Sequence, residues 1–266
     1  MDYVYAIILG IIQGITEFFP ISSSGHLLLL PQIFNVQDQG LTVDAVLHLA
    51  TALAIFYYFR AEWFSMLRSW KKSRLLRKII IASIPAVGLG LLFDSLIEDV
   101  LRSPWVVVVM LIGVAVFMWW VEQNYTEVKV VGQSETADKN LSQIGELDAI
   151  IIGLFQSIAL IPGTSRSGVT ITASMFRGLP RHVAAKFSFL LGGPITFGAG
   201  IFKLVDLVQT PDVDWGFVGI AGIVTFVVAV WAINWLLKYL NTNSLKIFIV
   251  YRIVLALAVS VLLLVS

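Results

Sequence analysis

A short polar sequence interrupts an apolar stretch near the start of the chain and returns 143 residues later. The first copy runs from Gln13 to His26 as Gln-Gly-Ile-Thr-Glu-Phe-Phe-Pro-Ile-Ser-Ser-Ser-Gly-His, and the second runs from Gln156 to Gly168. The residues shared at this offset are Gly10 with Gly153, Gln13 with Gln156, Ser22 with Ser165, Ser24 with Ser167, and Gly25 with Gly168. Polar groups at membrane depth are costly and usually mark function. The repeat therefore predicts one site built from two related halves.

The composition is that of a polytopic membrane protein. The chain is 58% hydrophobic with a mean hydropathy of +0.88 and 13% charged residues, whereas a soluble domain is about a quarter charged. It has no cysteine, which excludes disulfides and thiolate metal sites. No nucleic-acid partner is expected. The start, Met1-Asp2-Tyr3, lacks a basic region and is interpreted as retained.

Six segments are long and apolar enough to span a bilayer, which requires about 20 residues. They are 41–60, 78–97, 104–122, 187–205, 216–238 and 245–265. Two further regions, 3–30 and 148–176, are apolar but broken by Pro, Gly and Ser. Irregular backbone is tolerated at membrane depth only where protein or water satisfies it. These two regions are therefore predicted to be re-entrant helix–loop–helix hairpins.

The predicted order is hairpin, three spans, polar connector, hairpin, three spans. The first repeat covers 1–122, the connector 123–147 and the second repeat 148–266. Three spans is an odd number, so the second repeat must be inverted relative to the first. Inverted repeats with broken helices near the midplane are typical of membrane transporters. The fold class is all-α, with six spans and two re-entrant hairpins.

Basic residues suggest the orientation of this arrangement. The loop after the first span is rich in basic residues, which favour the cytoplasmic side. They are Arg60, Arg68, Lys71, Lys72, Arg74, Arg77 and Lys78. Placing that loop inside puts both termini on the external face.

The first polar box combines an acid with a serine turn. Gln13 and Glu17 are four residues apart, so on a helix they share one face. Pro20 then ends that helix, and residues 22–25 turn the chain. Such a turn can offer backbone N–H groups to an anion, reinforced by the N-terminus of the following helix. Ser22 and its neighbours supply hydroxyl groups.

The second box, Thr164-Ser165-Arg166-Ser167-Gly168, offers the same turn with a guanidinium in place of Ser23. Arginine suits bidentate contact with phosphate. Two anion-binding turns that face each other would suit a diphosphate. A hydrolase also needs a nucleophile or an activated water. The serines at 22–24 supply hydroxyl groups, and His26 is near enough in sequence to act as base or acid.

Structural interpretations remain open for each residue taken alone. The serines could cap helices, and Gln13 could donate a hydrogen bond between helices. Glu17 could orient His26 or bind a divalent cation with the phosphates, and Arg166 could be its counter-ion. Asp44 and His48 are also four residues apart and could line the site or pair locally, and the local pairing is favoured.

Together these motifs resemble the undecaprenyl-diphosphate phosphatases, also called bacitracin-resistance proteins. The resemblance covers essentially the whole chain and lies chiefly in the Gln13–His26 box and in Pro162-Gly-Thr-Ser-Arg-Ser-Gly168. It implies a bacterial inner-membrane enzyme that removes the terminal phosphate from a C55 polyprenyl diphosphate and recycles the carrier for cell-wall glycan synthesis. It also implies inverted repeats, a site open to the external face, and a divalent cation, Mg²⁺ or Ca²⁺.

The resemblance also implies roles for individual residues. The family's metal-binding acidic motif falls on Gln13 and Glu17, where Gln stands at a position that is Glu in some members. Its proposed nucleophile falls on Ser23, beside Ser22, its histidine on His26 and its phosphate-binding arginine on Arg166. Ser23 and His26 both remain open as nucleophile. The remaining phosphate-binding candidates are Thr164, Ser165 and Ser167.

Two other functions are considered. Lipid phosphatases of the acid-phosphatase type also carry a Ser-Gly-His element, but they require a histidine where this chain has Thr172. A polyprenyl-phosphate transporter or flippase would also use inverted repeats and broken helices. In a transporter, Glu17 and His26 would couple protons, and Ser23→Ala would be tolerated. The apolar faces of six spans would suit a homodimer as easily as membrane lipid.

Overall fold

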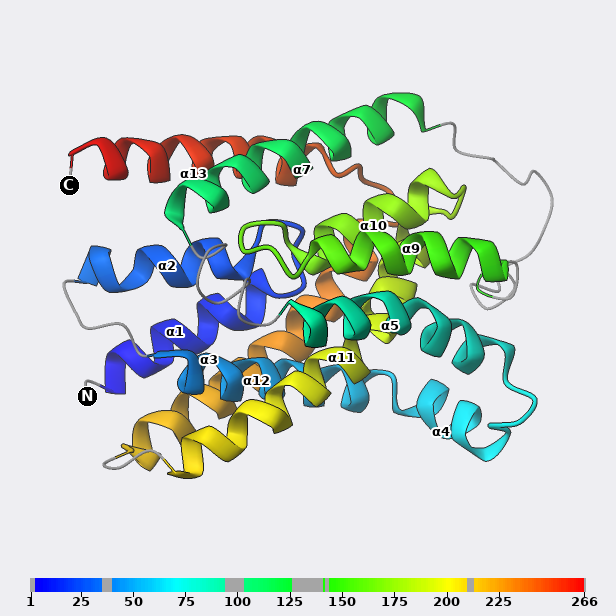
Figure 1. The fold of residues 1–266 in the computed structure, drawn as a ribbon, viewed down its shortest axis with the longest axis horizontal. Coiled ribbons are helices and arrows are strands. Elements are labelled where there is room, and N and C mark those ends of the chain that lie inside the picture. Colours follow the sequence, from blue (N-terminus) through cyan, green and yellow to red (C-terminus); the bar gives the residue numbers. More distant parts are fainter. Residues whose placement is uncertain are drawn as a thin grey trace.

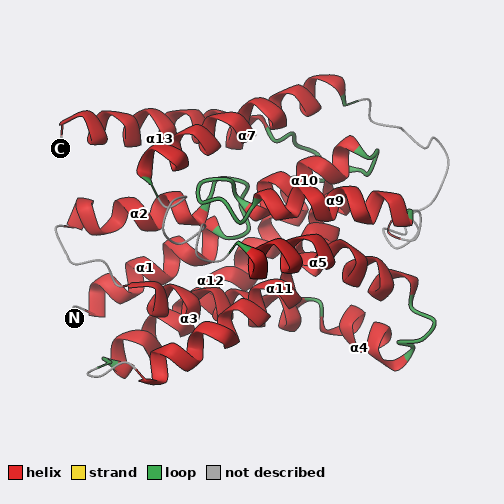
Figure 2. Ribbon diagram, viewed as in Figure 1, coloured by secondary structure: helices red, strands yellow, loops and turns green. Residues whose placement is uncertain are grey.

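The computed structural model describes residues 3–34, 40–93, 103–125, 141, 144–209 and 213–265. Within these residues the chain is helical and contains no strand (Figure 2). The helices are α1 (Tyr3–Thr16), α2 (Ser23–Phe34), α3 (Gly40–Tyr58), α4 (Arg60–Arg68), α5 (Arg74–Leu92), α7 (Pro104–Asn124), α9 (Glu146–Ile158), α10 (Arg166–Phe176), α11 (Arg181–Gln209), α12 (Trp215–Tyr239) and α13 (Lys246–Val265).

Five of the described helices are long and apolar enough to cross a membrane: α5, α7, α11, α12 and α13. A sixth span results if α3 and α4, which are bent by 74° at their junction, count as one. Large apolar side chains on these helices point outward, as they do in a protein whose exterior is lipid. The prediction of an all-α, multi-pass membrane protein is confirmed.

The helix ends differ from the predicted spans in two places. The helix that contains the span predicted at 187–205 begins six residues earlier, at Arg181 of α11. Its polar first turns pack against protein: Arg181 donates through Nε to Glu122 (3.0 Å), and Lys186 pairs with Glu62 (2.8 Å). Likewise α5 starts at Arg74 and ends at Leu92, not at 78 and 97. Residues 94–97, and 126–140 and 142–143 of the predicted connector, lie outside the described residues.

The two broken regions fold as paired short helices with a turn between them. Helices α1 and α2 have 14 and 12 residues, and α9 and α10 have 13 and 11. Each is shorter than the roughly 20 residues that a span needs. Figure 1 shows the α1–α2 pair reaching the middle of the bundle from the end where both termini lie. The α9–α10 pair reaches it from the opposite end, where α4 lies.

The helices of the two halves pack reciprocally. Helix α1 packs along α12 and α9 along α5, while α3 contacts α11 and α7 contacts α13. Equivalent glycines make the first two contacts close. A Cβ atom at Gly10 would lie 2.7 Å from the carbonyl oxygen of Ala221, and one at Gly153 would meet the carbonyl oxygen of Ala82 even more closely. Each half thus supplies the helix against which the other half's short helix lies.

Candidate active site

The first turn joins α1 to α2 and is ordered by its own serines. Ser22 has a positive φ of 74°, which is uncommon for a residue with a side chain. Its hydroxyl accepts a hydrogen bond from the N–H of Gly25 (3.4 Å) and lies 3.2 Å from the hydroxyl of Ser24. The turn therefore caps α2 and leaves the side chain of Ser23 at the first residue of that helix.

The second turn, between α9 and α10, repeats this geometry. Ser165 has a φ of 70°, and its hydroxyl accepts from the N–H of Gly168 (3.1 Å) and lies 3.2 Å from that of Ser167. Thr164 donates to the carbonyl oxygens of Ile158 and Ile161, so its hydroxyl is used within the turn. Arg166 takes the place that Ser23 has in the first turn.

Hydrogen bonds join the two turns directly. The hydroxyl of Ser24 accepts from the N–H of Gly163 (3.0 Å), and the hydroxyl of Ser167 donates to the carbonyl oxygen of Phe19 (3.1 Å). The N-termini of α2 and α10 therefore meet at the centre of the bundle. Helix N-termini are positive and favour anions, so this junction has the polarity that an anion site requires.

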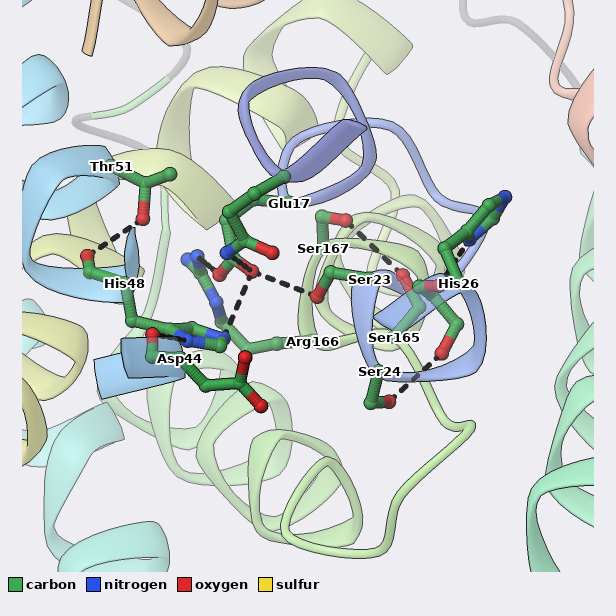
Figure 3. A network of polar contacts seen from close by, with 12 residues as sticks. Glu17, Ser23, Ser24, His26, Asp44, His48, Thr51, Ser165, Arg166 and Ser167 are labelled. Atoms are coloured by element: carbon green, nitrogen blue, oxygen red, sulfur yellow. Dashed lines mark hydrogen bonds and ion pairs between the residues drawn. The ribbon is translucent and has the colours of Figure 1, made fainter. Parts of the chain in front are cut away.

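Glu17 is the centre of the polar network in Figure 3. Its Oε1 accepts from NH2 of Arg166 at 2.8 Å. Its Oε2 accepts from the hydroxyl of Ser23 at 2.9 Å and from Nε2 of Gln13 at 3.3 Å. The carboxylate is 6% exposed and the guanidinium side chain 12%. The structure thus brings together four of the predicted residues, from both turns.

His48 of α3 also reaches this carboxylate. Its Nδ1 lies 2.7 Å from the carbonyl oxygen of Asp44, so the expected local contact exists. Its Nε2 in addition lies 3.4 Å from Oε2 of Glu17. Because a carbonyl oxygen can only accept, Nδ1 carries a hydrogen. When Nε2 is protonated as well, the ring is an imidazolium and the contact with Glu17 is charge-assisted.

His26 is not part of this cluster. Figure 3 shows its ring turned away from Glu17 and Ser23. Its Nδ1 lies 2.7 Å from the carbonyl oxygen of Ser22, and its Nε2 lies 2.7 Å from the hydroxyl of Tyr251, with the two rings stacked. Nδ1 therefore donates, and Nε2 accepts from Tyr251. In this arrangement the group placed to take the proton of Ser23 is Glu17.

Sequence reasoning missed two residues of α13. Tyr251 contacts His26, and Arg252 donates to the backbone of both turns, at Pro20 and Gly163. A signal for Arg252 was present, because it is the one charged residue between 247 and 266. An ionisable residue within a span is a functional candidate by default.

The residues of the site fit a divalent cation only if substrate completes its coordination. No group of three His, Cys, Asp or Glu side chains suited to a metal occurs among the described residues. Gln13 Oε1, however, is buried and has no hydrogen-bond partner. Glu17 Oε1 accepts one hydrogen bond, from Arg166, which leaves a lone pair. Two oxygens one helical turn apart suit a cation that shares its ligands with phosphate groups.

Comparison with known proteins gives one consistent result. The family model described as bacitracin resistance protein BacA matches residues 6–258. The undecaprenyl-diphosphatase of Pelotomaculum thermopropionicum is 41% identical over 98% of this chain and 97% of its own length. Undecaprenyl-diphosphatase 2 of Stutzerimonas stutzeri is 40% identical, and the undecaprenyl-diphosphatase of Hahella chejuensis 39%. Both of these alignments cover 96% of each chain.

Proposed function

Because the chain belongs to the bacitracin resistance protein BacA family, we propose that it is a membrane phosphatase acting on undecaprenyl diphosphate. The products are undecaprenyl phosphate and inorganic phosphate. Relatives that align over at least 96% of both chains carry the name of this activity. The cellular role is to recycle the C55 carrier for peptidoglycan and other cell-wall glycans and to confer bacitracin resistance.

The observation that carries the mechanism is the junction of Ser23, Glu17 and Arg166 across the two turns. The oxygen of Ser23 attacks the terminal phosphorus while its proton passes to Oε2 of Glu17. The bond from that phosphorus to the bridging oxygen breaks, and undecaprenyl phosphate leaves with the electron pair. Water then attacks the phosphorus of the phosphoserine and the bond from phosphorus to the oxygen of Ser23 breaks. That oxygen takes back the proton from Glu17, which releases inorganic phosphate and restores both the hydroxyl and the carboxylate.

Stabilisation of phosphate charge is the larger part of such catalysis. Phosphoryl transfer passes through a loose transition state, so positioning and electrostatics matter more than a strong base. Arg166 and the N-termini of α2 and α10 supply fixed positive charge at the junction. His26 remains the alternative nucleophile, but its Nε2 is engaged by Tyr251, so Ser23 is favoured.

Glu17 and the free Oε1 of Gln13 would hold a divalent cation, Mg²⁺ or Ca²⁺. When bound with substrate, the cation neutralises phosphate charge. Because Gln13 is an amide, its ligand strength is below that of a second carboxylate, which makes Glu17 the principal ligand. Ser22, Thr164, Ser165 and Ser167 shape the two turns around the phosphates.

We also propose that the chain consists of two inverted repeats, 1–122 and 148–266, joined by the connector 123–147. The reciprocal packing of α1 on α12 and α9 on α5 supports this, as do the two hairpins that enter from opposite ends. In the bacterial inner membrane, the basic residues near α4 favour the cytoplasmic side for that end. Both termini, and the mouth of the site, then belong to the external face. A homodimer is compatible with the apolar exterior.

The test measures phosphate release from C55 polyprenyl diphosphate by purified protein in detergent, with and without a chelator. Ser23→Ala should reduce release by at least about 1,000-fold, because the nucleophile is lost. Ser83→Ala, which removes a hydroxyl bonded only within α5 at the carbonyl of Ile79, is the matched control and should leave it unchanged. Full release by Ser23→Ala would move the nucleophile to His26 or water. No release from folded wild type would favour the lipid transporter.

A further inference from the structure

Arg252 is a buried charge for which the mechanism above has no use. It lies in the middle of the apolar helix α13 and is the largest of the fully buried side chains, at 0% exposure. It forms no ion pair with any described carboxylate. A charge inside a membrane protein is expensive to keep unless its donors are satisfied.

Main-chain carbonyls satisfy these donors. Nε donates to Leu111 (3.2 Å) and NH2 to Met110 (3.1 Å), both in α7. The same NH2 donates to Gly163 (3.0 Å), and NH1 to Pro20 (3.5 Å). One planar guanidinium therefore joins α7 to both turns of the site.

The two turn contacts fall on equivalent positions. Pro20 and Gly163 are separated by 143 residues, the offset that aligns the two polar boxes. Each lies three residues before the side chain that reaches Glu17, namely Ser23 in the first turn and Arg166 in the second. Because both carbonyls bond to one rigid group, the guanidinium restricts the distance between the turns, in addition to the two direct hydrogen bonds between them.

We propose that Arg252 is a positioning residue for the reaction, a role that rests on the proposed phosphatase function. It holds the two turns at the separation at which Ser23 and Arg166 both reach the carboxylate of Glu17. The neighbouring Tyr251 binds His26, so the same turn of α13 also contacts α2. Without Arg252 each turn keeps its serine cap and the two direct hydrogen bonds between the turns remain. The link through Pro20 and Gly163 is lost, so Ser23 and Arg166 are held less precisely at Glu17.

The first experiment compares Arg252→Lys with wild type in the phosphate-release assay, well below the thermal midpoint of each protein. Lysine keeps the charge but has a single ammonium that cannot span both turns. We expect kcat to fall about 100-fold, as for other small misplacements of reacting groups, with KM changed less than about threefold. Arg60→Lys is the control, since Arg60 also donates to a carbonyl, that of Tyr57, but is exposed. Its kcat should match wild type.

A double-mutant cycle separates positioning from general destabilisation. In an Arg166→Ala background the spacing of the second turn no longer matters, so Arg252→Lys should lower kcat there by less than about threefold. A loss of folded protein would instead lower it equally in both backgrounds. Wild-type kcat in Arg252→Lys, or equal losses in both backgrounds, would overturn the proposal. An inactive wild type would instead contradict the proposed function itself.

Discussion

The two turns share a backbone but differ in chemistry. Ser22 and Ser165 have nearly the same positive φ, and each caps the helix that follows it. Gln13 and Gln156 also correspond, and the Oε1 of each is buried without a partner. The matched serines therefore serve the geometry of the turns.

Among the positions that differ between the two turns, three concern side chains with a proposed or alternative role in the reaction. Glu17 corresponds to Leu160, Ser23 to Arg166, and His26 to Val169. The acid and the hydroxyl come from the first turn, and the fixed positive charge comes from the second. The comparison teaches that neither half is a site alone, because Glu17 is bonded to Ser23 in its own turn and to Arg166 in the other.

The sharpest test of this asymmetry is Glu17→Gln. The amide can neither take the proton of Ser23 nor neutralise Arg166, so kcat should fall by about 1,000-fold. Leu160→Met at the matching position conserves volume and should have little effect on kcat. Steady-state phosphate release with C55 polyprenyl diphosphate measures both. Comparable losses in the two variants would show that the halves are not chemically distinct.

Arg166→Lys tests whether the second turn contributes a guanidinium or only a charge. Lysine cannot make two parallel contacts with phosphate, so kcat should fall about 100-fold. Arg177→Lys is the matched control at the far end of α10, where Arg177 pairs with Asp148 at 2.6 Å and is partly exposed. A partly exposed ion pair of this kind contributes little to the stability of the protein. Near-normal turnover of Arg166→Lys in the same assay would refute bidentate contact.

His48→Asn tests whether α3 supports the first turn. Removal of the contact between Nε2 and Glu17 should lower kcat about tenfold, which corresponds to about 1.4 kcal/mol for a hydrogen bond to a charged group. The smaller effect is expected because Ser23 and Arg166 still hold the carboxylate. The same rate assay decides the matter, and an unchanged kcat would return His48 to a purely local role with Asp44.

The smallest effects on activity are expected where the halves are alike. Gly10→Ala and Gly153→Ala each place a methyl group against the backbone of the facing helix, so each should lower stability by about 1–3 kcal/mol. Gly113→Ala has open space and is the control. Thermal midpoints in detergent report the change. A loss at only one of the two glycines would contradict equivalent packing.

Local sequence features predicted the helices well. The six apolar segments each coincide with a described helix, because apolar length and breaks at Pro, Gly and Ser act within one segment. The starts of α5 and α11 were misplaced, since charged residues were read as loop. Arg181 is the first residue of α11 and donates to Glu122 of α7, a partner that no local pattern shows.

The site was predicted in part. Ser23, Glu17 and Arg166 were grouped from two motifs and a resemblance, and the structure places their side chains in contact. The partner of His26 was not foreseen, because Tyr251 is 225 residues away in sequence. For His48 the local pairing with Asp44 was favoured over a place in the site, because α3 approaches Glu17 only when the bundle packs.

The sequence by itself determined that this chain enters a membrane, which segments are helical, which two are broken, and which family it belongs to. These properties follow from hydrophobicity, from residues that interrupt helices, and from motifs read along the chain. The tertiary structure alone decided which groups meet. Glu17 and Arg166 are 149 residues apart, and Arg252 and Pro20 are 232 apart. Such contacts arise from the packing of helices across the two halves, which no local pattern encodes.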